Sequence, residues 1–429
     1  MRIQGLSQPL RGVTTVPGDK SVSHRAVMLG ALASGRTIIE GFLPGEDCLA
    51  TIRCFRLMGV DIRQEGSRVT VEGVGLRGLK SPDTVLDVGN SGTTIRLLMG
   101  ILAGQSFAAS ITGDASIRQR PMGRVAAPLR LMGADISSDR APVNIRPVPA
   151  LKGIHYHLPM ASAQVKSALL LAGLYADGAT SVTEPAVSRD HTELMLAAMG
   201  VPLRRSGLTV TLAGGHPLRS RAIRVPGDIS SAAFLMTAAL IVPDSDITLQ
   251  GVGVNPTRTG IIDVLQAMGG YIEVKPQAEE GAEPVADIRV RYSRLRGIEV
   301  AGDIIPRLID EIPALAVAAA FATGETTIRD AAELKVKESN RISAMVNGLR
   351  AMGADVSERE DGMSVRGGKP LTGVTLDSHH DHRIAMALAV AGLAAAGQTT
   401  VTGEECIPVS FPGFAETLRS LGADASMGV

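Results

Sequence analysis

Residues suited to binding anions gather at six points along the chain. Each point combines Gly, Ser, Thr, Asp or His with a strongly apolar stretch that follows, and the points are residues 17–25, 89–96, 162–167, 226–231, 309–313 and 379–385. The start of a helix presents unpaired backbone N–H groups and a partial positive charge, so it attracts anions. One such start is ordinary helix capping. Six of them predict a cleft that binds a small substrate with several negative charges.

Arginines near these helix starts add formal positive charge. Arg120 stands directly before a proline, with Arg118 and Arg124 close by, and Arg189 accompanies another repeat. Guanidinium groups match carboxylate and phosphate oxygens two at a time, which suits anionic metabolites. The rigid turn at the proline favours a binding role for Arg120. For Arg118 and Arg124, solvated surface positions are an equal alternative.

Acid–base chemistry is predicted for the second half of the chain. Asp310 and Glu311 open an apolar helix, and Lys337, Glu338 and Arg341 follow within a short span. If that span is helical, Lys337 and Arg341 share a face and Glu338 lies beside them. A carboxylate between two cations stays ionised and can accept and return a proton. A salt-bridged helix start is the structural alternative, and the spacing alone does not decide between the two.

No metal site is predicted from the cysteines and histidines. Cys48, Cys54 and Cys406 have neither metal-ligand spacing nor an even count for disulfides, which favours free thiols in a reducing compartment. Residues 379–382 read His-His-Asp-His, but consecutive histidines rarely point to one side and no partner cluster follows.

The elements that position these residues follow from a six-fold repeat of about 70 residues. A Met-Gly or Leu-Gly pair ends each helical pattern, at Gly59, Gly133, Gly200, Gly269, Gly353 and Gly422. Glycine at the end of a helix favours a left-handed cap before the chain enters a strand. A second helix in each repeat is apolar nearly all round, which predicts burial. We therefore expect an α/β fold with six β-α-β-α-β-β units in two pseudo-symmetric domains, and with inner and outer helix layers.

Composition excludes several classes of protein. Lys plus Arg and Asp plus Glu are 43 each, so no net field favours nucleic acid or a membrane surface. Aromatic residues are 3% of the chain and Trp is missing, which disfavours base-stacking platforms. The longest apolar runs, such as 384–397, fall short of the roughly 18 residues of a membrane span. The N-terminal residues lack the pattern of a targeting peptide, so a cytoplasmic enzyme is expected.

An ordered set of motifs resembles the 5-enolpyruvylshikimate-3-phosphate (EPSP) synthase family, 3-phosphoshikimate 1-carboxyvinyltransferase. The motifs are PGDKSVSHR from Pro17, GNSGTT from Gly89, RPMG from Arg120, SAQVK from Ser162, DEIP from Asp310, KESNR from Lys337 and DHRIAM from Asp381. The resemblance implies two domains of three repeats each, of the enolpyruvyl transferase, inside-out barrel type. The upper domain would span residues 15–223, the lower one residues 1–14 plus 224–429, with the active site in the cleft between them.

The resemblance also implies a reaction. The enolpyruvyl group of phosphoenolpyruvate would pass to the 5-hydroxyl of shikimate 3-phosphate, with release of phosphate, by addition and elimination through a tetrahedral intermediate. This is a step of the shikimate pathway to chorismate and the aromatic amino acids. The resemblance implies no metal and no organic cofactor, no nucleic-acid or membrane partner, and a monomer in the cytoplasm.

Roles for individual residues are implied by motif position alone. The catalytic residues would be Asp310, Glu338 and Lys20. Shikimate 3-phosphate would be bound by Lys20, Ser21, Arg25, Ser162, Ala163, Gln164, Arg189, Asp310 and Lys337. Phosphoenolpyruvate would be bound by Lys20, Gly92, Arg120, Gln164, Arg341 and Arg383.

The chain departs from the commoner, glyphosate-sensitive class at two points, because the phosphate-binding triplet contains Ala163 and Val409 stands where that class carries a lysine. Four motifs together resemble the second, often glyphosate-tolerant class, namely GDK at Gly18, SAQVK at Ser162, RDHTE at Arg189 and NPTR at Asn255. Gly92, however, keeps the small residue that leaves room for the inhibitor. Asn340 replaces a more usual Asp. The alternatives are a UDP-N-acetylglucosamine enolpyruvyl transferase, whose typical Lys-Asn pair and loop Cys do not occur here, and a non-catalytic relative of the same fold.

Overall fold

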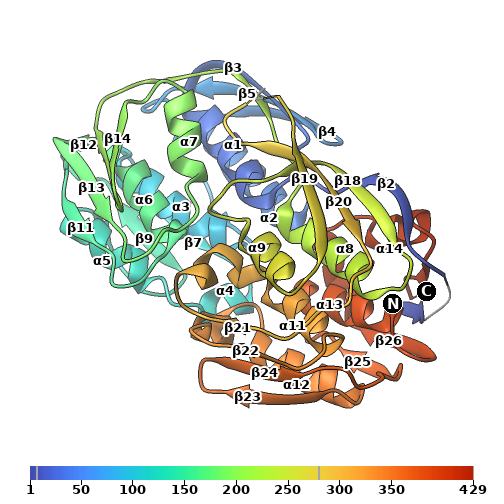
Figure 1. Ribbon diagram of the computed structural model, residues 1–429. Coiled ribbons are helices and arrows are strands. Elements are labelled where there is room, and N and C mark those ends of the chain that lie inside the picture. Colours follow the sequence, from blue (N-terminus) through green and yellow to red (C-terminus); the bar gives the residue numbers. More distant parts are fainter. Residues whose placement is uncertain (6–7, 279–280, 429) are drawn as a thin grey trace. The chain divides into compact units, whose positions relative to one another are not determined.

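The computed structural model describes residues 1–5, 8–278 and 281–428 (Figure 1). The chain divides into two compact units. Unit 1 comprises Met1–Pro17, Pro226–Glu279 and Pro284–Val429, and unit 2 comprises Gly18–Val225 together with Glu280–Glu283. Each unit holds three copies of one αβ motif.

Unit 2 runs through its three copies in sequence order. The first contains α1 (Lys20–Leu32), β3 (Ala33–Glu40), α2 (Glu46–Leu57), β4 (Asp61–Glu65) and β5 (Arg68–Val74). The second contains β6 (Leu86–Asp87), α3 (Gly92–Ala103), β7 (Ala109–Thr112), α4 (Ala115–Gln119), α5 (Gly123–Leu131), β8 (Asp135–Ile136) and β9 (Val143–Arg146). The third contains β10 (Leu151–Lys152), β11 (His155–His157), α6 (Ala163–Gly173), β12 (Ala176–Asp177), β13 (Ala179–Thr183), α7 (His191–Ala198), β14 (Leu203–Ser206) and β15 (Thr209–Ala213), followed by β16 (Leu218–Arg219) and β17 (Ala222–Arg224).

Unit 1 uses both ends of the chain. The N-terminal part supplies β1 (Arg2–Gln4) and β2 (Arg11–Thr15). The next copies contain α8 (Ile229–Ile241), β18 (Asp246–Gly253), α9 (Gly260–Ala267), β19 (Tyr271–Pro276), β20 (Val285–Arg291), β21 (Glu299–Val300), α10 (Ile305–Leu308), α11 (Ile312–Ala320), β22 (Glu325–Ile328), α12 (Arg341–Ala351), β23 (Asp355–Arg359) and β24 (Gly362–Arg366). The last contains β25 (Thr375–Asp377), α13 (His382–Leu393), β26 (Gln398–Thr402), α14 (Phe414–Ser420) and β27 (Asp424–Ser426). Short 3-10 turns are Gly302–Ile304, Ile309–Glu311, Ala332–Val336 and Glu404–Val409.

The six main sheets share one topology, in which a parallel pair is followed by two antiparallel neighbours. The order β6-β7-β9-β8 in unit 2 and the order β21-β22-β24-β23 in unit 1 are examples. The N-terminal strand β1 lies between β26 and β27 and thereby completes the sheet of the last repeat. The strands next to the two points where the chain passes from one unit to the other each pair within their own unit, β2 with β18 in unit 1 and β17 with β3 in unit 2.

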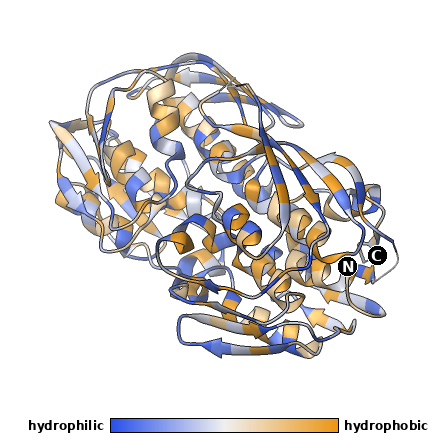
Figure 2. Ribbon diagram, in the orientation of Figure 1, coloured by the Kyte–Doolittle hydropathy of each residue, from blue (hydrophilic) through white to orange (hydrophobic). Residues whose placement is uncertain are grey.

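The apolar helices form an inner layer in each unit. In unit 2, α3 packs against α1 and α6, and in unit 1, α8, α11 and α13 pack against one another. Every residue of α8 is buried, whereas the strand β23 exposes most of its side chains. Figure 2 shows this contrast between largely hydrophobic helices and the hydrophilic β23. The predicted α/β fold with inner and outer helices is confirmed. Within the described parts of the chain, no helix is both long enough and apolar enough to cross a bilayer.

The predicted glycine caps explain how the outer helices end. All six glycines adopt positive φ angles, between 85° at Gly59 and 107° at Gly422, a region that costs other residues energy. At the first of them, the amide of Gly59 donates to the carbonyl of Arg56 and the amide of Val60 donates to Phe55, which closes the helix before β4 begins.

Candidate active site

Side chains cap the inner helices at the ends where the predicted site residues lie. Asp19, Ser91, Ser162, Asp228 and Asp381 each accept a hydrogen bond from a backbone N–H in the first turn. Such caps fix the direction in which a helix starts. They therefore fix the predicted site residues that follow within one or two turns.

The first turns of α1 carry Lys20, Ser21 and Arg25. Lys20 Nζ lies 3.0 Å from Asp47 Oδ2, and both side chains remain partly exposed. The buried guanidinium of Arg25 donates to the carbonyl oxygen of Ser21 at 2.9 Å, and also to Thr192 Oγ1 at 2.7 Å. Burial lowers the pKa of Arg25 to about 10, so it is still charged at neutral pH. The ammonium group of Lys20 is therefore partly exposed, whereas the charged guanidinium of Arg25 is buried.

Gly92 and Gln164 both lie next to the side chain of Arg96. Arg96 Nη1 donates to Gln164 Oε1 at 2.7 Å, and Gln164 Nε2 donates to Thr93 Oγ1 at 3.2 Å. A Cβ atom at position 92 would lie 2.9 Å from Arg96 Nη1 and 3.2 Å from Arg120 Nη1. Gly92 is thus packed against two guanidinium groups, and this close approach leaves no room for a methyl group without movement.

Arg120 is held by side chains of its own repeat. Its Nη2 donates to Asn90 Oδ1 at 2.6 Å and to Ser116 Oγ at 3.1 Å. Among the described residues, the buried Nε–H of Arg120 has no hydrogen-bond acceptor. Arg118 and Arg124 are exposed, in keeping with the surface alternative for both. An unused donor on a fixed guanidinium suits binding of an anion.

A buried cluster that we call the Lys166 cluster (Lys166, Glu184 and Glu193) ties α6 to the segment that carries Arg189. Lys166 Nζ lies 2.6 Å from Glu184 Oε2 and 2.8 Å from Glu193 Oε1, and its side chain is 1% exposed. Burial raises the pKa of Glu193, although Lys166 opposes this shift. Arg189 lies close enough to Arg25 to lower the pKa of Arg25. The cluster therefore positions the helix start at Ser162–Gln164 relative to Arg189.

A chain of buried hydroxyl groups lies under the same helix starts. His24 Nδ1 is 2.7 Å from Thr51 Oγ1, Thr51 is 2.8 Å from Thr94 Oγ1, and Thr94 is 2.6 Å from Ser91 Oγ. Burial lowers the pKa of His24 to about 3, so its ring is neutral at physiological pH. These neutral hydrogen bonds join α1, α2 and α3.

Unit 1 contains a second group, the Arg341 cluster, which comprises Arg341, Asp310, Glu338 and Asp381. Arg341 is 1% exposed, and its nitrogens lie 3.2 Å from Asp310 Oδ1, 2.5 Å from Glu338 Oε2 and 2.8 Å from Asp381 Oδ2. Burial disfavours the charged guanidinium, but the carboxylates of Asp381, Glu338 and Asp310 outweigh it and raise the pKa of Arg341. One permanently charged group thus holds three carboxylates in fixed positions.

The two more exposed carboxylates of this cluster differ from the third. The side chains of Asp310 and Glu338 are 12% and 28% exposed, whereas that of Asp381 is fully buried. Arg341 lowers the pKa of Asp381 against the effect of burial, so Asp381 stays ionised. Asp310 and Glu338 are therefore the members that can reach a substrate, and Asp381 fixes the guanidinium between them.

The helical arrangement assumed for Lys337 and Arg341 is wrong. A 3-10 turn ends at Val336, Lys337 is extended, and α12 begins only at Arg341, with Asn340 as its N-cap. Asn is as good an N-cap as Asp, which is why the helix starts normally here. Lys337 still reaches Asp310, with Nζ 3.7 Å from Oδ1, and it also pairs with Glu333 at 3.0 Å.

Arg383 lies on the first turn of α13, next to the Arg341 cluster. Its Nη1 donates to the carbonyl oxygen of Asp310 at 2.9 Å and lies 3.9 Å from Glu311 Oε1. The fully buried Glu311 also pairs with Arg258 at 3.0 Å and accepts a short hydrogen bond from Ser230. Glu311 therefore helps to position the guanidinium of Arg383.

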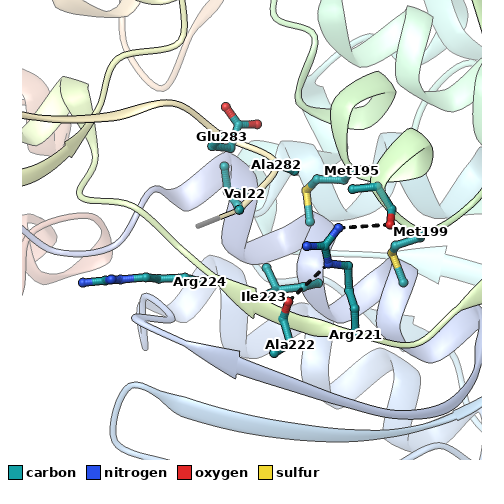
Figure 3. Close-up of a pocket in the computed structure, with 11 residues that line it drawn as sticks. Val22, Met195, Met199, Arg221, Ala222, Ile223, Arg224, Ala282 and Glu283 are labelled. Atoms are coloured by element: carbon teal, nitrogen blue, oxygen red, sulfur yellow. Dashed lines mark hydrogen bonds between the residues drawn. The ribbon is translucent and has the colours of Figure 1, made fainter. Parts of the chain in front are cut away.

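A small pocket in unit 2 lies apart from the predicted site residues. It is lined by Val22, Met195, Met199, Ile223 and neighbouring residues, and Figure 3 shows the side chain of Arg221 among these residues. Its volume of about 20 Å³ holds roughly one water molecule. It is therefore too small for a substrate.

Several supporting residues escaped the sequence-based prediction. Asp381, Lys166, Asp47 and Arg96 each contact a predicted site residue or its helix, as described above. Asp381 and Lys166 do lie inside the quoted motifs, so the motifs held a signal for them. Glu184 and Glu193 have no such local signal, because only the tertiary structure brings them to Lys166.

The chain is similar to known proteins over nearly its whole length. A model of the family "EPSP synthase (3-phosphoshikimate 1-carboxyvinyltransferase)" matches residues 5–418. A 3-phosphoshikimate 1-carboxyvinyltransferase from Pelotomaculum thermopropionicum is 60% identical, covering 98% of both chains. One from Desulforudis audaxviator is 59% identical, covering 96% of this chain and 97% of that protein.

Solved structures agree with the sequence relatives. An EPSP synthase from Acinetobacter baumannii superposes with a TM-score of 0.90 at 49% identity, and the match covers 99% of each chain. The enolpyruvyl transferase NikO from Streptomyces tendae has a TM-score of 0.82 at 19% identity over 99% of this chain and 98% of that one, which shows the shared fold alone. The chain therefore belongs to the EPSP synthase family of transferases.

Proposed function

We propose that this protein transfers the enolpyruvyl group of phosphoenolpyruvate to the 5-hydroxyl of shikimate 3-phosphate and releases phosphate. The single observation that carries the proposal is the Arg341 cluster, in which one buried guanidinium holds Asp310 and Glu338 within 3.2 Å and 2.5 Å. Addition of a hydroxyl to the enol phosphate of phosphoenolpyruvate needs one group that takes a proton from the hydroxyl and another that gives a proton to the methylene carbon. Two partly exposed carboxylates on one cation supply both.

The steps follow from these positions. Asp310, in its ionised form, accepts the proton of the 5-hydroxyl as the hydroxyl oxygen attacks C2 of phosphoenolpyruvate. Glu338, which enters this step protonated, donates its proton to C3, which becomes a methyl group. Glu338 then removes a proton from that methyl group, the double bond re-forms, and the C2–O bond to phosphate breaks. Lys20 balances negative charge on the phosphate and assists proton transfer. Asp310 passes the hydroxyl proton to the departing phosphate and Glu338 regains the proton it gave, so both groups end as they began and the atoms balance.

Binding of the two anions is assigned to both units. Shikimate 3-phosphate is bound by Lys20, Ser21, Arg25, Ser162, Ala163, Gln164, Arg189, Asp310 and Lys337, and phosphoenolpyruvate by Lys20, Gly92, Arg120, Gln164, Arg341 and Arg383. The helix starts, the guanidinium groups and the unused Nε–H of Arg120 support this assignment. The proposal also includes a monomeric, cytoplasmic protein.

The test is phosphate release from phosphoenolpyruvate in the presence of shikimate 3-phosphate or UDP-N-acetylglucosamine. We expect release only with shikimate 3-phosphate, and a loss of about 10²–10⁴-fold in kcat for Glu338→Gln and for Asp310→Asn. Lys20→Met in unit 2 should abolish turnover as well. Glu325→Gln removes an exposed carboxylate of unit 1 that pairs with Arg366, and should leave the rate unchanged. Normal turnover in Glu338→Gln would reject the assigned mechanism, and release with the other acceptor would reject the substrate.

A further inference from the structure

Two histidines that are assigned no part in the reaction lie side by side on the edge strand of a sheet in unit 2. The strand β11 lies at the edge of the sheet β11-β13-β15-β14 (Figure 1). Side chains alternate along a strand, so His155 and His157 share one face while Tyr156 points to the other. Tyr156 packs against the core, and both histidines are exposed.

The two imidazole rings bring their Nε2 atoms close together. His155 Nε2 and His157 Nε2 are 2.9 Å apart, and the rings meet edge to face, with centroids 4.6 Å apart. Two nitrogens that bind one ion at about 2.0–2.1 Å and at a right angle would be about 3 Å apart. The observed separation is therefore that of two adjacent ligands in square-planar or octahedral coordination. This geometry is typical of Cu²⁺ and Ni²⁺.

The surroundings leave room for the rest of a coordination shell. In the register of the sheet, His155 lies opposite Ser181 and His157 opposite Thr183. These hydroxyl groups bond to the next strand, with Ser181 2.8 Å from Thr211 and Thr183 2.7 Å from Thr209. The sheet face beside the histidines is thus neutral and polar. Within the described residues no group of three or more His, Cys, Asp or Glu side chains is arranged around a metal, so water would fill the remaining positions.

We propose that His155 and His157 form a two-histidine surface site for a late divalent transition-metal ion, Cu²⁺ or Ni²⁺ ahead of Zn²⁺. Without an ion, one ring donates its Nε2–H to the other ring. Binding requires both rings to carry their proton on Nδ1, so that both Nε2 lone pairs face the ion. The site is independent of the transferase reaction, since neither histidine touches a residue assigned to it.

The experiment is calorimetric titration of the full chain, freed of any affinity tag and of metal, with Ni²⁺ and with Cu²⁺. One ion should bind per chain. His155→Asn and His157→Asn should each weaken binding at least as much as the roughly 10–100-fold that loss of a supporting group costs at metal sites. Both positions are exposed, so the variants should fold, which circular dichroism checks.

The matched control is His216→Asn, which removes a histidine of unit 2 that has no second histidine two positions away. It should bind the ion as the unaltered chain does. Electron paramagnetic resonance of the Cu²⁺ form should show two nitrogen ligands, and one in either variant. No binding, or binding that both variants retain, would overturn the proposal; retained binding would point to His379 and His380, which lie beside Asp377 and Glu405.

Discussion

At the scale of single residues, small differences in exposure separate residues with similar chemistry. Asp310, Glu338 and Asp381 all contact Arg341, yet only the first two reach the surface. A buried carboxylate that pairs with a buried guanidinium mainly stabilises the structure, because removing it would leave the guanidinium in the interior without that partner. The same logic separates Lys20, which is partly exposed, from Lys166, which is not.

Gly92 gives a prediction at this scale. In Gly92→Ala, the added methyl group would lie 2.9 Å from Arg96 Nη1 and 3.2 Å from Arg120 Nη1, so both guanidinium groups must move. Because these are flexible ends, we expect a modest cost of about 1–3 kcal/mol, seen as a roughly tenfold or greater rise in KM for phosphoenolpyruvate. Glyphosate, the longer ligand, should lose more affinity than phosphoenolpyruvate.

Steady-state kinetics with each substrate varied in turn checks this. The KM for shikimate 3-phosphate serves as the internal control and should change little. An unchanged KM for phosphoenolpyruvate, together with unchanged glyphosate inhibition, would show that Arg120 is not at the phosphoenolpyruvate site.

At the scale of elements, buried polar groups hold helix starts in place. The hydroxyl chain from His24 to Ser91 joins three helices of unit 2, and the Lys166 cluster joins α6 to residues 184–193. Apolar packing fixes the distance between helices but is non-directional, whereas a hydrogen-bonded cluster also fixes rotation and translation. This explains why charged groups remain in a layer that is otherwise apolar.

Lys166→Met tests the Lys166 cluster. The change leaves Glu184 and Glu193 buried beside each other without their cation, so we expect a loss of about 3–5 kcal/mol in unfolding free energy. The triple variant Lys166→Met, Glu184→Gln, Glu193→Gln removes the unpaired charges and should regain most of that loss. Lys152→Met, an exposed position of the same unit, should change stability by less than about 0.5 kcal/mol.

Denaturant unfolding measures all three proteins, and hydrogen exchange over 163–173 locates the effect. A single variant as stable as the starting protein, or a triple variant no better than the single one, would show that the cluster does not hold α6.

At the scale of the whole molecule, the chain joins its two ends in one sheet. The strand β1 lies between β26 and β27, so a strand from the start of the chain completes the repeat at its end. The strand β2 makes the same point, since it pairs with β18, more than 200 residues further along the chain. Unit 1 therefore cannot be cut out as one continuous piece of sequence, whereas the strands of unit 2 all lie within residues 18–225.

Ile3→Ala tests this closure. Ile3 is fully buried in β1, and its truncation should cost about 2–5 kcal/mol. Hydrogen exchange should quicken in 398–402 and 424–426, some 400 residues along the chain, and stay unchanged in α3 of unit 2. Gln4→Ala, on the exposed face of β1, is the control and should have little effect. Unchanged exchange in both distant strands would show that β1 does not support that sheet.

Local sequence patterns were enough to predict the secondary-structure elements and the class of chemistry. Glycine caps, apolar helices and strand patterns depend on neighbours a few residues away, so the six repeats and the α/β fold could be predicted from local patterns. The ordered motifs were enough to indicate the EPSP synthase family, to which the chain belongs. The motifs did not predict the local structure at Lys337 and Asn340, because Asn340 is the N-cap of α12 and the helix therefore begins only after it.

Only the tertiary structure decided which groups meet. Arg341 finds Asp310 and Asp381 at separations of 31 and 40 residues, and Arg25 reaches Ser167 across 142 residues. Lys166 likewise pairs with two carboxylates among the 43 acidic residues of the chain. Such contacts depend on where repeats stack and which groups burial forces to pair, and a local pattern does not record this. His155 and His157, by contrast, are close in the sequence as well as in space. Even so, both side chains face solvent because their strand lies at the edge of the sheet.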